Sequence, residues 1–264
     1  MEHIPEEKIK GAPSLFDLKG RTALITGGSR GLGRGMALAL AASGVDVAVV
    51  SRTQSDLEVV AEEVRNLGRK GLAIKADVSD EEQVEGMVSQ VVEEFKRINI
   101  LINAAGIVFI KPTTEYPLEE WQRVMNVNLR GTFLCCKHVG KVMLKQGEGK
   151  IINISSVRGL QGRANDPSYP ASKGAVNMLT KSLALEWARN NITVNAIAPT
   201  FIRTSISASL LDDQSWREWI VSRIPMGRTG EIWDLFGPML FLASRASDFV
   251  TGQILYVDGG WIAG

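Results

Sequence analysis

The sequence predicts one α/β domain with a seven-stranded parallel sheet and helices on both faces. Two observations predict it: short apolar runs alternate with longer segments of helical period, and the glycine-rich residues 26–33 follow the first apolar run directly. A chain of 264 residues is long enough for one large domain of this class. No internal repeat, low-complexity segment or flexible linker divides residues 20–264, so we expect them to form a single domain.

Seven short apolar runs are the expected strands. They span residues 22–25, 47–50, 72–74, 100–102, 151–154, 194–197 and 254–257. Helical segments follow the strands, as at residues 36–42 and 121–129. The clearest helix lies between the third and fourth strands, where residues 84–95 place apolar side chains at helical spacing and residues 79–82 predict a capping box with Ser79 at its start.

Two regions fall outside these repeated units. Residues 1–19 carry charges where a signal peptide would be apolar, and we expect a surface extension there. Residues from about 200 to 229 are the least regular and predict an insertion or lid. This segment contains Trp216, Trp219, Pro225 and Gly227.

Composition and charge limit the kind of partner. A net charge of +1 gives no broad field to attract nucleic acid or an anionic membrane, and no run approaches the ~20 apolar residues of a membrane span. Cys135 and Cys136 are adjacent and cannot form a normal structural disulfide, and no cluster of Cys or His predicts a metal site. We therefore expect a cytoplasmic protein whose partner is a small molecule.

A glycine-rich turn follows the first expected strand and opens a helix. Glycines there let the backbone approach a pyrophosphate, which the N–H groups of the helix N-terminus stabilise. The alternative is a plain strand-to-helix connection that needs positive φ. The residues predicted to contact a dinucleotide are Gly27, Ser29, Arg30, Gly31, Leu32 and Gly33.

The end of the second expected strand favours NADP over NAD. NAD sites usually carry an acid there to bind the ribose 2′-hydroxyl. This chain has Ser51 and Arg52 instead, and Arg52 with Arg30 could pair with a 2′-phosphate. The alternative is that both arginines are solvated surface charges.

Two further strand ends supply residues for the rest of a dinucleotide. Asp77, followed by Val78, ends the third strand and could accept a hydrogen bond from the adenine amino group, or could simply lead into the next helix. Residues 103–106 end the fourth strand with small side chains that would let a ribose and a nicotinamide pass close to the backbone. The contacts expected there come from Asn103, Ala104 and Gly106.

Tyr169 and Lys173 are four residues apart and share one face if the segment is helical. A Lys charge about 4 Å from the phenol, at an effective dielectric of ~20, would lower the pKa of Tyr169 by roughly 3 units and make it a working acid or base. The alternative is a half-buried Tyr beside a solvated Lys.

Two more polar residues point to the same chemistry. Ser156 closes the fifth strand on the edge where ligands of open α/β sheets bind, so its hydroxyl could bind a substrate carbonyl or merely cap the strand. Asn128 places an amide on an otherwise apolar helical stripe, where it could hold a water in a proton path or cap a neighbouring strand.

With these motifs in order, the chain over about residues 18–262 resembles the short-chain dehydrogenase/reductase family. The resemblance implies a Rossmann fold with Asn128, Ser156, Tyr169 and Lys173 as catalytic residues. Tyr169 would carry the proton, Ser156 would orient the carbonyl, and Lys173 would bind the nicotinamide ribose. The resemblance also implies a homotetramer or homodimer.

This chain departs from the family pattern at Ala104, where Asn is usual, and at Thr200, where Gly is usual after Pro199. Thr200 stands where the nicotinamide should pack. The resemblance still implies contacts to the carboxamide from Ile202 and Thr204, and it implies that Pro199 contacts the cofactor.

Within the family, residues 195–199, 241–249 and 257–261 are similar to sugar-acid dehydrogenases, notably gluconate 5-dehydrogenase and 2-deoxygluconate 3-dehydrogenase. Arg158 and Arg163 follow the catalytic strand and could bind a substrate carboxylate, or could belong to an exposed polar loop. Two alternatives remain: a 3-oxoacyl thioester reductase of the same fold, and a dinucleotide-sensing protein without turnover, against which the intact Tyr169 and Lys173 pair argues.

Overall fold

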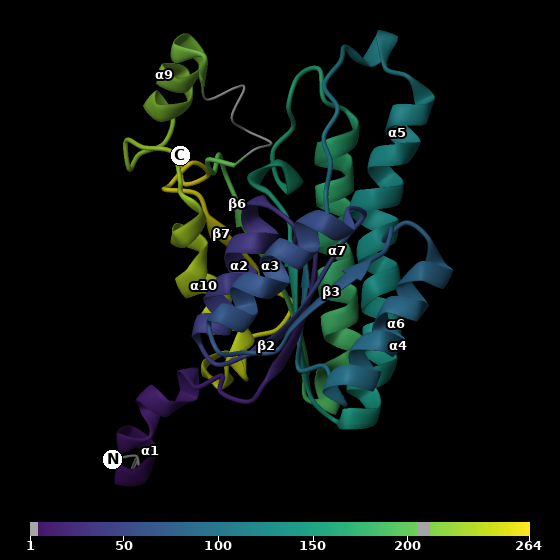
Figure 1. The fold of residues 1–264 in the computed structure, drawn as a ribbon. Helices are drawn as coiled ribbons and strands as arrows, with labels where there is room; N and C mark the ends of the chain where they lie inside the picture. The colour runs from purple at the N-terminus through teal and green to yellow at the C-terminus, as the bar shows by residue number, and fades with distance from the viewer. Residues whose placement is uncertain (1–4, 205–211) are drawn as a thin grey trace.

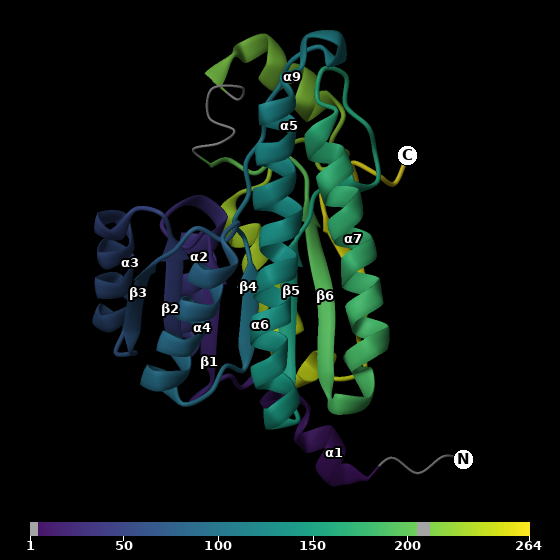
Figure 2. The same ribbon diagram turned by 90° about the vertical axis from the view of Figure 1, so that its right-hand side faces the viewer.

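The computed structural model describes residues 5–204 and 212–264, and within them seven parallel strands form one sheet (Figures 1 and 2). Their order across the sheet is β3-β2-β1-β4-β5-β6-β7. The strands are β1 Thr22–Thr26, β2 Asp46–Ser51, β3 Gly71–Lys75, β4 Ile100–Asn103, β5 Gly149–Ile154, β6 Ile192–Pro199 and β7 Ile254–Val257. Every expected strand lies within an observed one, which confirms the predicted fold class.

Helices cover both faces of the sheet, because each face is apolar and must be removed from water. One face carries α4 Glu81–Phe95, α6 Gly131–Gln146 and α7 Ser168–Trp187, as Figure 2 shows. The other carries α2 Gly31–Ala42, α3 Gln54–Asn66 and α10 Phe236–Ala243. The central strands are buried from both sides: Leu101 packs into the first layer and Ile102 into the second.

The two ends of the sheet differ in what surrounds them. Beyond the carboxyl ends of the strands lie α5 Leu118–Met125 and α9 Gln214–Ser222, and the short α1 Glu6–Lys10 lies at the opposite end (Figures 1 and 2). The expected lid falls partly on α9, and its residues 205–211 lie outside the described part of the chain.

The register of the sheet brings the predicted motifs to one edge. Thr26 pairs with Val50 on one side and with Asn103 on the other, and Asn103 pairs in turn with Asn153. The segments that follow β1, β2, β4 and β5 therefore start at the same level, at the carboxyl edge where open α/β sheets bind ligands.

The start of α4 differs by one residue from the predicted capping box. Asp80, not Ser79, is the N-cap, and its carboxylate accepts hydrogen bonds from the backbone N–H groups of Glu82 and Gln83 at 3.0 and 3.1 Å. The Ser79 side chain is directed at Asp77 and not at the helix, since its hydroxyl donates to Asp77 Oδ1 at 2.7 Å. The prediction of Ser79 as the cap was wrong.

Candidate active site

Tyr169 and Lys173 lie on the first turns of α7, which packs beside β6 and the short helical turn Val157–Gly159 after β5. The hydroxyl of Ser156, the second residue after β5, interacts with the Tyr169 phenol and favours its ionised form. Ser156 Oγ also accepts a hydrogen bond from the backbone N–H of Arg158 at 3.1 Å. The hydroxyl proton of Ser156 can therefore be directed at an oxygen of a ligand beside Tyr169.

Lys173 is buried, with 5% of its surface exposed. Its Nζ donates to the carbonyl oxygen of Ile154 at 2.7 Å and lies 5.5 Å from the centre of the Tyr169 ring. Burial without a carboxylate partner lowers the pKa of Lys173 to about 8. The other protons of the ammonium are available to hydroxyl groups of a ligand.

The pKa of Tyr169 is raised above its ordinary value of 10.0, chiefly because burial disfavours the phenolate. The Ser156 hydroxyl and the charges of Arg163 and Arg158 act in the opposite direction and offset only part of that effect. The prediction that Lys173 lowers the pKa of Tyr169 was wrong for the protein chain alone, because the Lys173 ammonium is itself disfavoured by burial and is directed at Ile154. The phenol, the proton-donating form, is favoured at neutral pH.

Asn128 is fully buried in a π-helical turn, Asn126–Arg130, between α5 and α6. Its Oδ1 accepts from the Ile107 N–H at 2.8 Å, and its Nδ2 donates to the Ile107 carbonyl at 2.9 Å and to Ser172 Oγ at 3.1 Å. The amide thus fixes the segment that follows β4 and ties it to α7. Its part in a proton path stays a prediction.

Sequence reasoning missed the role of Ser172. Its hydroxyl accepts from Asn128 and donates to the Tyr169 carbonyl at 2.7 Å, so it holds the helical turn that carries Tyr169 and Lys173. It also missed Asp166, whose Oδ1 accepts from the backbone N–H of Tyr169 at 3.2 Å. A Ser one position before the Lys, and an Asp shortly before the Tyr, are signals too common to single out either residue.

The glycine-rich turn after β1 has the close approaches that only glycine allows. Gly27 and Gly31 have φ of +66° and +54°, and a Cβ on Gly33 would lie 2.2 Å from the carbonyl oxygen of Gly27. A Cβ on Gly27 would lie 2.8 Å from the backbone of Ala104. The turn therefore packs between the start of α2 and the residues after β4, and its backbone N–H groups at the helix start form a cradle for an anion.

Arg30 and Arg52 have exposed side chains, and neither is ion-paired among the described residues. The Gly28 N–H donates to the Val50 carbonyl at 3.1 Å, so the glycine turn abuts the end of β2 and brings Arg30 near Ser51 and Arg52. That both arginines meet a phosphate stays a prediction. Ser29 and Leu32 are partly exposed on the same turn.

The other predicted dinucleotide contacts occupy the same edge. The Asp77 carboxylate accepts from the N–H and hydroxyl of Ser79 through one oxygen, Oδ1, and Val78 beside it is buried against Gly131. The Asn103 amide donates to Asn153 Oδ1 at 2.9 Å, so its Nδ2 serves the contact between β4 and β5. A Cβ on Gly106 would lie 3.7 Å from Lys173 Nζ, which puts the segment after β4 beside Lys173.

The residues after β6 complete this edge. Pro199 ends the strand, and Ile202 bridges to Gly230. The Thr204 side chain lies 3.7 Å from the position of a Cβ on Gly31, so this segment meets the glycine turn. Thr200 Oγ1 and Asn103 Oδ1 are buried and have no hydrogen-bond partner among the described residues. Two orphaned polar atoms beside a glycine cradle fit a polar ligand such as a dinucleotide.

Arg158 and Arg163 lie between β5 and α7, and the charges of both act on the Tyr169 phenol. Arg163 Nη1 lies 3.8 Å from the buried Asp166 carboxylate. Arg158 donates to the Gly162 carbonyl at 2.9 Å and is only partly exposed. Both side chains are partly buried, and their binding of a substrate carboxylate stays a prediction.

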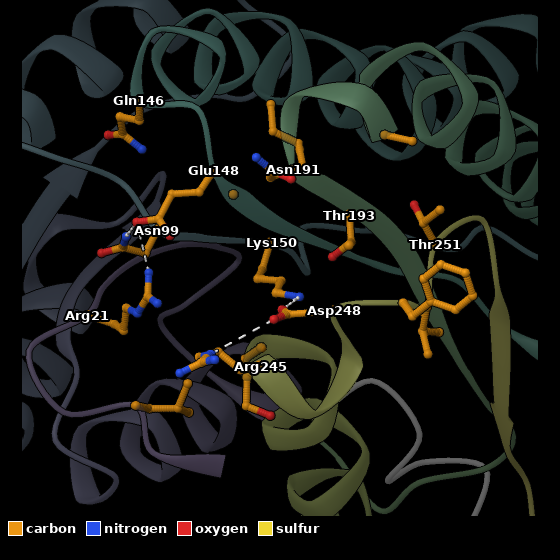
Figure 3. A pocket seen from close by; sticks show the side chains of 18 of the residues that line it. Arg21, Asn99, Gln146, Glu148, Lys150, Asn191, Thr193, Arg245, Asp248 and Thr251 are labelled. Carbon is orange, nitrogen blue, oxygen red and sulfur yellow. Dashed lines mark hydrogen bonds and ion pairs between the residues drawn. The ribbon is translucent and has the colours of Figure 1, made fainter. Parts of the chain in front are cut away.

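A cavity of about 880 Å³ lies elsewhere, around the amino ends of β5 and β6 (Figure 3). Its charged residues pair with one another: Arg21 with Glu148 at 3.0 Å, and Lys150 with Asp248 at 2.8 Å. This cavity is at the opposite end of the sheet from Tyr169 and contains none of the residues predicted from the motifs. We therefore place the reacting groups at the carboxyl edge.

Across residues 5–204 and 212–264 there is neither a helix able to span a membrane nor a metal-binding group of His, Cys, Asp and Glu side chains.

Comparisons with known proteins agree with this arrangement. A protein-family model described as "Enoyl-(Acyl carrier protein) reductase" matches residues 27–262. The chain is 46% identical to the 2-dehydro-3-deoxy-D-gluconate 5-dehydrogenase of Bacillus subtilis over 248 residues, which cover 94% of this chain and 97% of the relative. It is 38% identical to the gluconate 5-dehydrogenase of Gluconobacter oxydans, with 94% and 97% covered.

A solved structure gives the same result. The crystal structure of a gluconate 5-dehydrogenase from Burkholderia cenocepacia, in complex with NADP and tartrate, superposes with a TM-score of 0.92 at 38% identity. The match covers 95% of this chain and 99% of that one. These relatives are oxidoreductases that act on sugar acids, according to their names.

Proposed function

Because the chain belongs to the short-chain dehydrogenase/reductase family, we propose that it is an NADP-dependent oxidoreductase that interconverts a secondary alcohol and a ketone on a sugar acid. The observation that carries the proposal is the placement of the Tyr169 phenol beside Ser156 and Lys173, at the same edge of the sheet as the glycine turn. The names of the relatives suggest gluconate and 5-ketogluconate, or 2-dehydro-3-deoxy-D-gluconate, as the substrates to test first.

The residues at the carboxyl edge fit a dinucleotide, and NADPH bound there would supply the hydride. The glycine turn would hold the pyrophosphate, Arg30 and Arg52 the 2′-phosphate, and Asp77 the adenine amino group. Lys173 would donate to the nicotinamide ribose. Solved relatives hold NADP. The remaining residues proposed to contact the cofactor are Gly27, Ser29, Gly31, Leu32, Gly33, Ser51, Val78, Asn103, Ala104, Gly106, Pro199, Ile202 and Thr204.

Tyr169 would donate its phenol proton to the carbonyl oxygen as the ketone is reduced, and would take it back in the reverse direction. Its raised pKa suits the donor role, because the phenol is the populated form at neutral pH. Ser156 would hold the same oxygen through its hydroxyl. Asn128 would act by fixing Ile107 and, through Ser172, the turn of α7 that carries Tyr169.

A sugar acid differs from a simple ketone by its hydroxyls and its carboxylate. Arg158 and Arg163 lie beside Tyr169 and offer guanidinium groups that bind carboxylates with two parallel hydrogen bonds. The Burkholderia relative holds tartrate, itself a hydroxy acid. These features favour an anionic, hydroxylated substrate.

A 3-oxoacyl thioester reductase is the second candidate, and one observation favours it. Leu160, Trp219 and Met226 expose 62%, 45% and 72% of their surface on the segments that flank the site, and such apolar surface could accept an acyl chain. Initial rates with NADPH against 5-keto-D-gluconate, simple ketones and an acetoacetyl thioester separate the two. We expect reduction of the keto acid; reduction of the thioester alone would refute the sugar-acid proposal.

Assembly and location are part of the same proposal. β7 is an edge strand, and Phe249 just before it is fully exposed, so this edge is available to a second copy in a homodimer or homotetramer. Light scattering coupled to size exclusion measures the assembly directly. The free, buried thiols of Cys135 and Cys136 suit the reducing cytoplasm.

A further inference from the structure

Two arginines and two tryptophans from distant parts of the chain meet beside the site. The Arg223 guanidinium carbon lies 5.4 Å from the ring centre of Trp219 and 5.4 Å from that of Trp261. The Arg158 guanidinium carbon lies 5.6 Å from the Trp261 ring centre. Both cations thus share one indole, at distances typical of cation–π contacts. We refer to Arg158, Arg223, Trp219 and Trp261 as the arginine–tryptophan cluster.

Trp261 is the fixed element of this cluster. It is 6% exposed, and its Nε1 donates to Gln161 Oε1 at 2.7 Å. It packs with Val157 after β5 and with Ile220 of α9 in a small separate core. The C-terminal segment therefore joins α9 to the loop after β5, and Arg223, which directly follows α9, is held on the same side as Arg158.

The charges of the cluster are not balanced by acids. No ion pair joins Arg158 or Arg223 to a carboxylate in the described parts of the chain; the nearby Asp166 pairs with Arg163. The pKa of Arg158 is lowered, first by burial and then by the positive charges of Arg163 and Arg223, against the opposing charges of Asp166 and Tyr169. Arg158 is partly buried and Arg223 is exposed, and two cations held this close disfavour one another unless an anion joins them.

The cluster lies next to the reacting groups. Arg158 is two residues after Ser156, and its backbone N–H donates to the Ser156 hydroxyl. The charge of Arg158 also acts on the Tyr169 phenol. An anionic group bound between Arg158 and Arg223 would therefore belong to the molecule whose carbonyl meets Tyr169.

We propose that Arg223 is a specificity-determining residue, which together with Arg158 binds the carboxylate of the substrate while Trp261 holds the two guanidinium groups in place. The proposal rests on the sugar-acid function and deepens it, because it assigns the carboxylate end of the substrate to one named pair. The two planar guanidinium groups match the two oxygens of a carboxylate, which a neutral group cannot replace.

The test compares Arg223→Gln with the wild type on D-gluconate and D-gluconamide, two ligands that differ only in the charge of one end. Binding is followed by tryptophan fluorescence in the presence of NADP, since Trp219 and Trp261 flank Arg223, and turnover by the rate of NADPH formation. We expect Arg223→Gln to weaken the binding of D-gluconate by about 10- to 100-fold, which is the effect of one lost charge-assisted hydrogen bond. The affinity for D-gluconamide should stay within about 3-fold of the wild-type value.

Arg217→Gln is the matched control, because Arg217 is an exposed arginine of α9 outside the cluster and its loss changes the net charge equally. We expect it to bind both ligands as the wild type does. Arg223→Lys keeps the charge but lacks the planar guanidinium group, so its affinity for D-gluconate should fall between those of the wild type and Arg223→Gln. Melting temperatures show whether each variant is folded.

Equal losses on both ligands would show that Arg223 only supports α9, and no loss on D-gluconate would likewise overturn the proposal. A wild type that binds D-gluconate no more tightly than D-gluconamide would also overturn it. Failure of the proposed function gives a different result: the wild type would turn over neither D-gluconate nor any keto sugar acid, whereas failure of the Arg223 assignment alone would leave that turnover intact.

Discussion

Replacing Lys173 should change how the stability of the protein depends on pH. The pKa of Lys173 falls from its ordinary 10.5 to about 8 in the folded protein, because the ammonium is buried. At about 1.36 kcal/mol for each pKa unit, the buried charge destabilises the folded state by roughly 3 kcal/mol at neutral pH. Lys173→Met removes that charge, so the two proteins should differ in their response to alkaline pH.

The sign follows from which state binds more protons. Between pH 8 and 10.5 the unfolded chain keeps the Lys173 proton while the folded protein has released it, so the stability of the wild type rises with pH relative to the variant. Well below pH 8 both states are protonated and the difference is constant. Integrated from pH 7 to pH 10, the relative gain of the wild type is about 2.5 kcal/mol.

Urea unfolding of the wild type and Lys173→Met at pH 7, 8, 9 and 10 measures this difference, and subtraction cancels the titration of every other group. Lys173→Gln serves as a control, because it can still donate to the Ile154 carbonyl but carries no charge. It should give the same pH-dependent difference, whatever its absolute stability. A difference that stays flat between pH 7 and 10 would refute the assignment of a buried, destabilised ammonium.

Three further substitutions test the site. Tyr169→Phe should lower kcat by about 10²–10⁴-fold with dinucleotide affinity nearly unchanged, and a variant that keeps more than roughly a tenth of the wild-type kcat would exclude Tyr169 as the acid. Arg52→Asp, alone or with Arg30→Ala, should weaken the binding of NADPH by on the order of ten- to a hundredfold and should change the binding of NADH little. The ratio of the two dissociation constants measures this effect. Equal losses of affinity for both cofactors would mean that the arginines only support the turn. Asn128→Ala should reduce the free energy of unfolding by about 1–3 kcal/mol, because it leaves the Ile107 N–H and carbonyl without their partner; urea titration showing no loss would contradict the geometry described for this amide.

Much of the fold and part of the site follow from local patterns in the sequence. Apolar runs at regular intervals predict the strands, because a strand of a parallel sheet is buried on both faces. The parallel order then requires the segments after the strands to meet at one edge, so the glycine turn, Arg52, Asp77 and Ser156 could be assigned to that edge before any coordinates existed. The four-residue spacing of Tyr169 and Lys173 likewise depends only on the helical period.

Tertiary structure decided what depends on burial and on contacts between distant segments. The pKa of Tyr169 is raised where the spacing with Lys173 predicted lowering, because desolvation is set by the whole surroundings of a group and not by its neighbour on the helix. The apolar residues at helical spacing around Asn128 do not predict the π-helical turn in which it lies. Arg223 and Trp261 belong to no sequence motif. They lie near Arg158 because α9 and the C-terminal segment pack together against the loop after β5. That packing is the sum of many weak apolar contacts, which no short stretch of sequence encodes.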